Sequence, residues 1–257
     1  MTEINYEEQT KITRAIIKSA VLMLEFGAES ILVEQTAERL GKALGVGSIQ
    51  MSLIPSAIVL TTLYNNQSVT TTRRVHHKPI NMSIVCDVQK MVIQVEKNKY
   101  DAPFVNATLK DIQPSHYNRW LVVFMVGLAC ASFAVLQNGD LYAFIITFFV
   151  ASIAMFIRQE LNRKRFVMII TFGVTAFLAT IIASLAMLLK TTTTPNIVYA
   201  SSILLLVPGV PFVNSFLDAF KGYLSMGWGR WLQASLLTIA SSMGIVLAMS
   251  IMNIKGW

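Results

Sequence analysis

Hydrophobic and polar residues follow two different patterns along the chain, and the change between them falls near residue 119. In the first part, apolar residues recur at helical spacing among charged ones. In the segment 7–26, for example, Ile12, Ile16 and Met23 would share one helix face. In the second part, long apolar segments follow one another with short polar stretches between them. The pattern predicts a folded polar domain over residues 1–118 and a transmembrane domain over residues 119–257.

The polar half has the signals of a small α+β domain. Helical spacing of its apolar residues predicts three helices, over residues 7–26, 29–44 and 83–99. Two runs of β-branched residues within 57–75 flank the pair Asn65-Asn66, which is typical of a hairpin turn. Pro103 and Pro114 frame a segment that we expect to be a short connection without secondary structure.

The apolar segments of the second half have the lengths of membrane-spanning helices. Such a helix needs about 20 apolar residues, with a range of about 17–25. Five segments are predicted to span, over residues 120–136, 141–157, 166–189, 196–217 and 231–254. The fold class that follows is an α-helical integral membrane protein with five transmembrane helices and an N-terminal cytoplasmic α+β domain.

The charges between these segments predict their orientation. Residues 158–165 and 218–230, which we expect to be loops, carry several Lys and Arg, whereas the opposite loops, 137–140 and 190–195, carry only Lys190. Loops rich in Lys and Arg stay in the cytoplasm. The start of the chain is polar and lacks the apolar region of a signal peptide. We therefore expect the polar half in the cytoplasm and the C-terminus in the periplasm.

The fourth apolar segment interrupts its own helical pattern. It contains the sequence LLLVPGVPFVNSF (204–216), with Pro208, Gly209 and Pro211 near its centre. Proline inside a helix removes a backbone hydrogen bond and clashes with the preceding turn, at about 3 kcal/mol. Transporters use such breaks near the bilayer midplane to hold polar substrates. A helix that restarts near Pro211 would direct its positive end at the break, which suits a carboxylate; a packing kink is the alternative.

Polar residues on both sides of the break complete a candidate substrate-binding set. Its members are Ser201, Ser202, Pro208, Gly209, Pro211, Asn214 and Asp218. Other Ser and Thr residues of the spans fit either close helix packing or the lining of a pathway. The charged residues Arg158, Asp218 and Lys221 fall at the predicted cytoplasmic ends of spans, where we expect solvated side chains.

Composition and charge narrow the function classes. Hydrophobic residues make up 54% of the chain and charged residues 14%, against about 25% charged in typical soluble domains. The net charge of +7 could suggest a nucleic-acid partner, but the first 119 residues hold 13 Lys and Arg against 11 Asp and Glu. Most of the excess lies at the ends of the apolar segments, where it favours contact with membrane lipid. We therefore expect no nucleic-acid partner.

Patterns for catalysis or metal binding are absent from the sequence. The two cysteines, Cys86 and Cys130, fall in different halves, and no Cys/His metal spacing or nucleophile motif occurs. We expect no catalytic residues, no metal and no cofactor. One basic segment, 73–81, could contact an anion or could be a solvated loop; its basic residues are Arg73, Arg74, His76, His77 and Lys78.

Five motifs, taken in order, resemble the threonine/serine exporter family. They are FGAES (26–30), AIVLTT (57–62), HKPIN (77–81), IRQEL (157–161) and LLLVPGVPFVN (204–214). The resemblance covers nearly the whole chain, and the Pro-Gly-x-Pro element is its most specific motif. It implies export of small metabolites across the bacterial inner membrane. Full-length members join a soluble domain to about twice as many spans, and short members are similar to proteins that work with a separate, YjjB-like membrane subunit.

The resemblance also implies a class of substrate. Such two-subunit pairs are associated with succinate export, so our hypothesis is a subunit that exports small carboxylates, succinate first among them. A threonine/serine exporter is the alternative, because both substrates carry a carboxylate. A membrane-tethered hydrolase lacks the nucleophile that it needs, and a scaffold would need only one span. Because one broken helix looks like half of a pathway, the chain could also form an oligomer.

Overall fold

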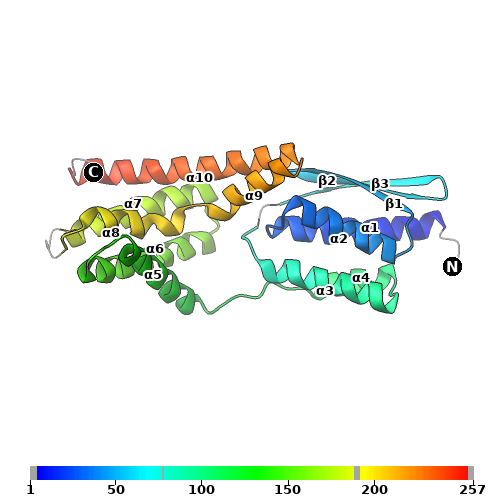
Figure 1. The fold of residues 1–257 in the computed structure, drawn as a ribbon, viewed down its shortest axis with the longest axis horizontal. Helices are drawn as coiled ribbons and strands as arrows, with labels where there is room; N and C mark the ends of the chain where they lie inside the picture. Colours follow the sequence, from blue (N-terminus) through cyan, green and yellow to red (C-terminus); the bar gives the residue numbers. More distant parts are fainter. Residues whose placement is uncertain (1–4, 77, 188–191, 254–257) are drawn as a thin grey trace. The chain divides into compact units, whose positions relative to one another are not determined.

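The computed structural model describes residues 5–76, 78–187 and 192–253, which form two units (Figure 1). The first unit contains the described residues up to His116 together with Phe212–Trp231. The second contains Tyr117–Pro211 together with the described residues from Leu232 on. A part of the expected transmembrane region, Phe212–Trp231, therefore packs with the polar half of the chain.

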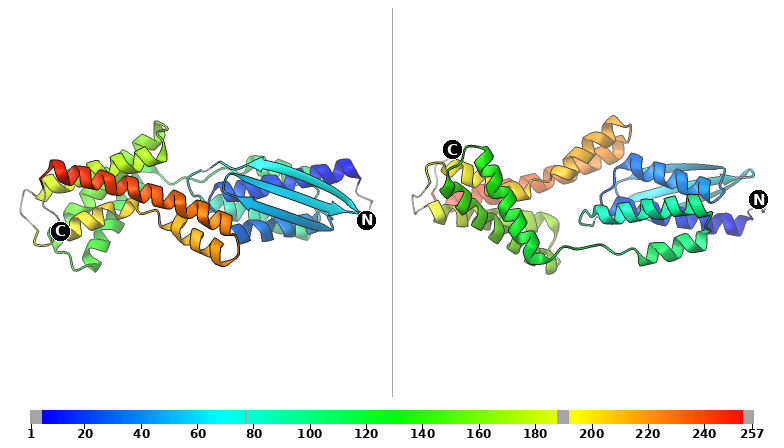
Figure 2. Two further views of the ribbon diagram at one scale, coloured as in Figure 1. Left: turned by 90° about the horizontal axis from the view of Figure 1, so that it is seen from above. Right: turned by 60° about the horizontal axis from the view of Figure 1, so that its bottom comes forward.

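The polar part of the first unit packs four helices with a three-stranded sheet. The helices are α1 (Tyr6–Glu25), α2 (Ser30–Ala43), α3 (Met82–Asn98) and α4 (Ala102–Asp111), and the strands are β1 (Ser48–Ile54), β2 (Ala57–Tyr64) and β3 (Gln67–Arg74). The strands are antiparallel in the order β1-β2-β3, and α1 and α2 lie against the sheet (Figures 1 and 2). Apolar side chains from both layers form one core, which includes Ile16, Leu40, Ile58, Leu60 and Val88.

The three helices predicted in this half and the predicted hairpin are confirmed. Asn65 and Asn66 form the turn between β2 and β3 with φ angles of 44° and 63°. Both angles lie in the left-handed region that a two-residue hairpin turn requires and that asparagine tolerates. The sequence pattern does not predict β1, because most of its residues are exposed or half-buried and give little apolar alternation.

The prediction of an unstructured connection after Pro103 is wrong, because this segment forms α4. Pro103 stands in the first turn of that helix, where its missing N–H would have no helical partner in any case. Asp101 caps the same turn by accepting a hydrogen bond from the Phe104 amide at 3.2 Å. Proline therefore starts this helix instead of ending one.

The second unit is built from the apolar segments. Its helices are α5 (Arg119–Leu136), α6 (Leu141–Arg163), α7 (Met168–Met187), α8 (Pro195–Ile203) and the short 3₁₀ helix η1 (Leu204–Leu206). Two further helices, α9 (Gly209–Phe220) and α10 (Leu224–Ile251), have residues in both units. Among the described residues, α5, α6, α7 and α10 are long and apolar enough to cross a membrane. The pair α8–η1 and α9, bent by 62°, makes a fifth span if it counts as one.

Two of the predicted loops are mostly helical. The segment 158–165 continues α6 as far as Arg163, and the segment 218–230 holds the end of α9, a tight turn and the start of α10. Gly222 makes that turn possible with a φ of 90°. The predictions failed because Arg, Lys, Glu and Gln favour helices, so that the end of an apolar run is not the end of a helix.

Small residues bring the helices of the second unit close together. A Cβ atom added at Gly244 of α10 would stand 2.3 Å from the Gly173 carbonyl oxygen of α7. One apolar cluster joins Val150 and Ala154 of α6 to Tyr199 of α8. A second cluster seats Leu206 of η1 on α7. These contacts fix α8 and η1 against α6 and α7, and they thereby position the interruption that follows.

Candidate functional site

The interruption predicted in the fourth apolar segment is present between η1 and α9. Val207 is extended, with φ −70° and ψ 120°, and α9 begins at Gly209. The Val207 amide donates to the Leu204 carbonyl at 3.1 Å, and the Gly209 amide donates to the Val207 carbonyl at 2.9 Å. Pro208 has no amide hydrogen to donate. The regular helical bonds are therefore replaced by shorter-range ones, and the carbonyl of Leu205 loses its helical donor.

Arg158 of α6 supplies a donor to this carbonyl. Its Nη1 lies 2.8 Å from the Leu205 carbonyl oxygen, and its guanidinium carbon lies 4.6 Å from the centre of the Phe172 ring. The expectation of a solvated charge at the end of a span is wrong for this residue, since its side chain folds inward onto the broken helix. Arg158 did not belong to the predicted set, although the IRQEL motif contains it.

The two serines of the predicted set precede the break on α8. Ser201 and Ser202 are both fully buried, and their hydroxyls have no hydrogen-bond partner among the described residues. The Thr147 and Thr175 hydroxyls, on α6 and α7, are in the same condition. Hydroxyls of helical Ser and Thr commonly donate to the preceding turn, as Thr180 does to Ala176. Unsatisfied buried hydroxyls are polar groups available to a ligand or water.

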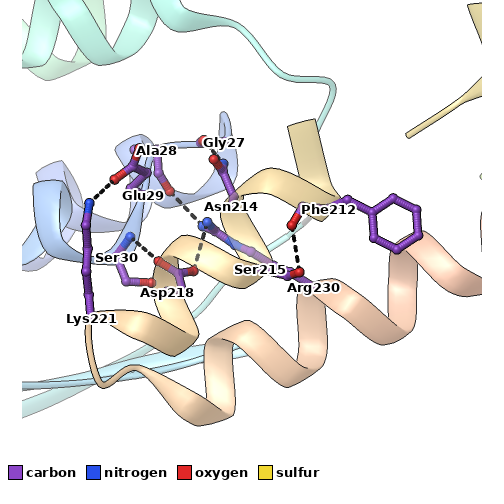
Figure 3. A network of polar contacts seen from close by, with 10 residues as sticks. All are labelled: Gly27, Ala28, Glu29, Ser30, Phe212, Asn214, Ser215, Asp218, Lys221 and Arg230. Atoms are coloured by element: carbon purple, nitrogen blue, oxygen red, sulfur yellow. Dashed lines mark hydrogen bonds and ion pairs between the residues drawn. The ribbon is translucent and has the colours of Figure 1, made fainter. Parts of the chain in front are cut away.

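The two predicted residues that follow the break, Asn214 and Asp218, contact the first unit instead (Figure 3). Asn214 Nδ2 donates to the Gly27 carbonyl at 3.1 Å. Asp218 accepts a hydrogen bond from the Ser30 amide at 3.0 Å and forms an ion pair with Arg230 at 2.9 Å. The protein itself thus occupies the polar groups of both side chains, and Asp218 is fully buried. The expectation of a solvated Asp218 is wrong.

Asp218, Arg230 and the loop between α1 and α2 form a polar cluster, which we call the latch (Figure 3). Arg230 Nη2 donates to the Ala28 carbonyl at 2.6 Å, so that its guanidinium joins Asp218 to the loop. The residue that precedes α2, Glu29, makes no side-chain cap bond to that helix. The carboxylate of Asp218 therefore satisfies a free amide at the N-terminus of α2, where the helix dipole also favours a negative charge.

Two features of the sequence permit the latch. Gly27 has a φ of 97°, which L side chains rarely adopt, and it lets the chain turn between α1 and α2. A Cβ atom added at Gly227 of α10 would stand 2.7 Å from the Ser215 carbonyl oxygen of α9. Around the turn, Lys221 pairs with Glu29 at 2.6 Å, and Tyr223 donates to Glu34. Burial raises the pKa of Tyr223, and its bond to Glu34 adds to this effect.

The basic segment after β3 contacts a carboxylate of the protein. Glu25, 8% exposed, pairs with Lys78 Nζ at 2.5 Å and accepts from the His76 amide at 3.1 Å. The His76 ring nitrogen lies 3.4 Å from the same carboxylate. Arg73 and Arg74 are exposed at the end of β3, and His77 lies outside the described residues. The basic cluster thus already has an internal anionic partner.

Comparison with known proteins decides the family. A family model described as "Putative threonine/serine exporter" matches residues 14–252. The chain belongs to the threonine/serine exporter family. It is 45% identical over 252 residues to a protein of Escherichia coli K12 described as "Probable succinate transporter subunit YjjP", covering 98% of both chains. A Klebsiella aerogenes protein with the same description is 43% identical over 97% of both chains.

A more distant member of the family differs in length. A Mycobacterium tuberculosis protein described as "Probable threonine/serine exporter" is 21% identical over 93% of this chain but only 46% of its own length. The present chain thus corresponds to about half of that protein. No solved structure gives a significant match. Together with the apolar helices, the family identifies a multi-pass membrane transporter, and the relatives' names point to transport and not to catalysis.

Proposed function

We propose that the chain is one subunit of an exporter in the bacterial inner membrane, and that it moves a small carboxylate, succinate in the first place, together with a YjjB-like second membrane subunit. The observation that carries this proposal is the interrupted helix at Pro208–Pro211 in a chain of this family. The interruption leaves backbone groups without their helical partners inside an apolar segment, where a polar substrate can use them. The relatives named as succinate transporter subunits support the substrate and the need for a partner.

The half-length match supports the two-subunit arrangement. The related Mycobacterium tuberculosis exporter is about twice as long as this chain. A chain that carries one broken helix then needs a second, equivalent part, because transporter sites form between two related halves. The partner is a separate subunit or, as the alternative, a second copy of this chain.

Threonine or serine is the second candidate substrate. The family description and the name of the Mycobacterium relative favour an amino acid. Both substrate classes offer a carboxylate, so the interrupted helix alone does not separate them. Efflux of labelled succinate and labelled threonine from vesicles that contain both subunits separates the two candidates. We expect succinate efflux to exceed threonine efflux; the reverse order would transfer the proposal to the amino acid.

The proposed orientation places the polar half in the cytoplasm and the segment after α10 in the periplasm. The basic residues between α6 and α7 and between α9 and α10 support it. Reporter fusions at Gly139 and after α10 test this topology. We expect both fusions to report the periplasm, and a cytoplasmic signal after α10 would contradict the five-span arrangement.

A further inference from the structure

Arg158 is a cation inside the second unit without a carboxylate partner. Its printed contacts are the hydrogen bond to the Leu205 carbonyl and the face of the Phe172 ring. Among residues 5–76, 78–187 and 192–253, no carboxylate forms an ion pair with it. The nearby acid of the same helix, Glu160, pairs with Arg119 at 2.8 Å. The charge of Arg158 is therefore not neutralised within the described chain.

The guanidinium of Arg158 lies at the depth of the helix break. The starts of α6 and α8 lie at one level, because Asp140, just before α6, accepts hydrogen bonds from the Thr192 hydroxyl at 2.7 Å and from the Thr193 amide at 2.8 Å. From that level, at 1.5 Å per residue, Leu205 lies about 15 Å along α8 and η1. This is about half of a hydrocarbon core roughly 30 Å thick. Arg158 reaches back from the last turns of α6 to the carbonyl at this depth.

Charged side chains at such a depth are costly and are characteristic of substrate pathways. The break itself does not require a full guanidinium, since one neutral donor would satisfy the Leu205 carbonyl. Arg158 has five N–H groups in a planar fork, of which one makes the bond to Leu205. The remaining donors match the two oxygens of a carboxylate.

Hydrogen-bonding groups next to Arg158 also lack partners. Ser201 precedes Leu205 by one helical turn, and its buried hydroxyl makes no hydrogen bond among the described residues. Thr147 lies on the same face of α6 as Arg158, three turns away, and its buried hydroxyl is equally unpartnered. A cation and unsatisfied hydroxyls on α6 and α8 form the chemistry that recognises a small carboxylate with further polar groups.

We propose that Arg158 binds the carboxylate of the transported substrate at the helix break, with the Ser201 hydroxyl as a second contact. This assignment rests on the proposed function and names the group that selects its substrate class. The Leu205 carbonyl holds the guanidinium in place at the site. Asn214 and Asp218 have no part in it, because the latch occupies them.

The experiment measures binding of labelled succinate and labelled threonine to the purified complex of this chain with its second subunit. The variants are Arg158→Gln and Arg158→Lys, and the matched control is Arg163→Gln, which removes an exposed charge from the end of the same helix. Competition by the uncharged diamide of succinate measures how strongly the site selects a carboxylate. A group that only supports the break would change stability and leave this selectivity unchanged.

We expect Arg158→Gln to weaken succinate binding about 10- to 100-fold, the usual loss for a hydrogen bond to a charged group. Its preference for succinate over the diamide should fall by the same factor, while the control keeps wild-type values. Should Arg158→Gln fail to assemble, Arg158→Lys keeps the charge and one donor, and we expect it to weaken succinate binding about tenfold because the fork is lost.

Each other result is decisive. Wild-type affinity and selectivity in an assembled Arg158 variant would overturn the assignment and leave the proposed function standing. If threonine binds to the wild-type complex and succinate does not, the same losses measured with threonine support Arg158 as its carboxylate site. A wild-type complex that binds neither substrate would overturn the proposed function and the assignment with it.

Discussion

The replacement of Asp218 by asparagine tests whether the latch holds the α9–α10 turn on the first unit. Asparagine keeps an oxygen for the Ser30 amide but removes the charge that faces Arg230 at 2.9 Å. The Arg230 side chain is only 11% exposed, so its charge would remain in a poorly hydrated place. Breaking a buried ion pair by removing one partner costs about 3–5 kcal/mol. Arg230 retains its bond to the Ala28 carbonyl, so we expect a loss at the lower end, about 3 kcal/mol.

The double variant Asp218→Asn, Arg230→Met separates this effect from a general loss of packing. It removes both charges and leaves no unpaired cation, and replacing a buried pair by apolar groups is often neutral or stabilising. We therefore expect the double variant to be clearly more stable than Asp218→Asn alone. Urea unfolding of the detergent-solubilised chain gives the free energies of unfolding. Hydrogen exchange at the Ser30 amide shows whether the latch opens locally.

Two results would refute the reasoning. If Asp218→Asn changed the free energy of unfolding by less than about 0.5 kcal/mol, Asp218 and Arg230 would behave like an exposed pair. If the costs of the two single substitutions simply added in the double variant, the side chains would not interact.

Two more predictions concern the second unit. In the triple variant Pro208→Ala, Gly209→Ala, Pro211→Ala, we expect a continuous helix, because proline costs about 3 kcal/mol and glycine about 1 kcal/mol relative to alanine; succinate export should collapse while membrane insertion persists, whereas wild-type substrate binding by the assembled variant would show that the break is only architecture. Asp140, whose pKa is lowered to about 2, chiefly by the Thr193 amide, should stabilise the fold above about pH 4, and this contribution should disappear as the pH falls from about 4 to about 2. Acid unfolding of Asp140→Asn should lack that component, and an unchanged pH profile would contradict the role of the carboxylate.

The elements of the fold followed from local patterns wherever one signal acted alone. The amphipathic spacing of α1, the Asn65-Asn66 turn and the Pro-Gly-x-Pro interruption each depend on neighbouring residues, and all three are present. The prediction failed where one residue type has two uses. Pro103 begins α4 instead of breaking the chain, since proline is tolerated in the first turn of a helix.

The candidate site was harder to predict because its contacts join distant parts of the chain. Asp218 caps a helix whose first residue lies 188 positions away, and Arg158 reaches a carbonyl 47 positions away. Position at the end of an apolar run suggested solvated charges for both residues. Only the packing of α6 on η1, and of α9 on the loop between α1 and α2, shows that both side chains turn inward.

Efflux of labelled succinate from proteoliposomes tests the central claim most directly, that this chain is half of a carboxylate exporter. The vesicles contain this chain alone, the YjjB-like subunit alone, or both. We expect rapid efflux only when both subunits are present, since one broken helix forms half of a site. Full efflux from this chain alone, or none of succinate or threonine from the pair, would contradict the claim.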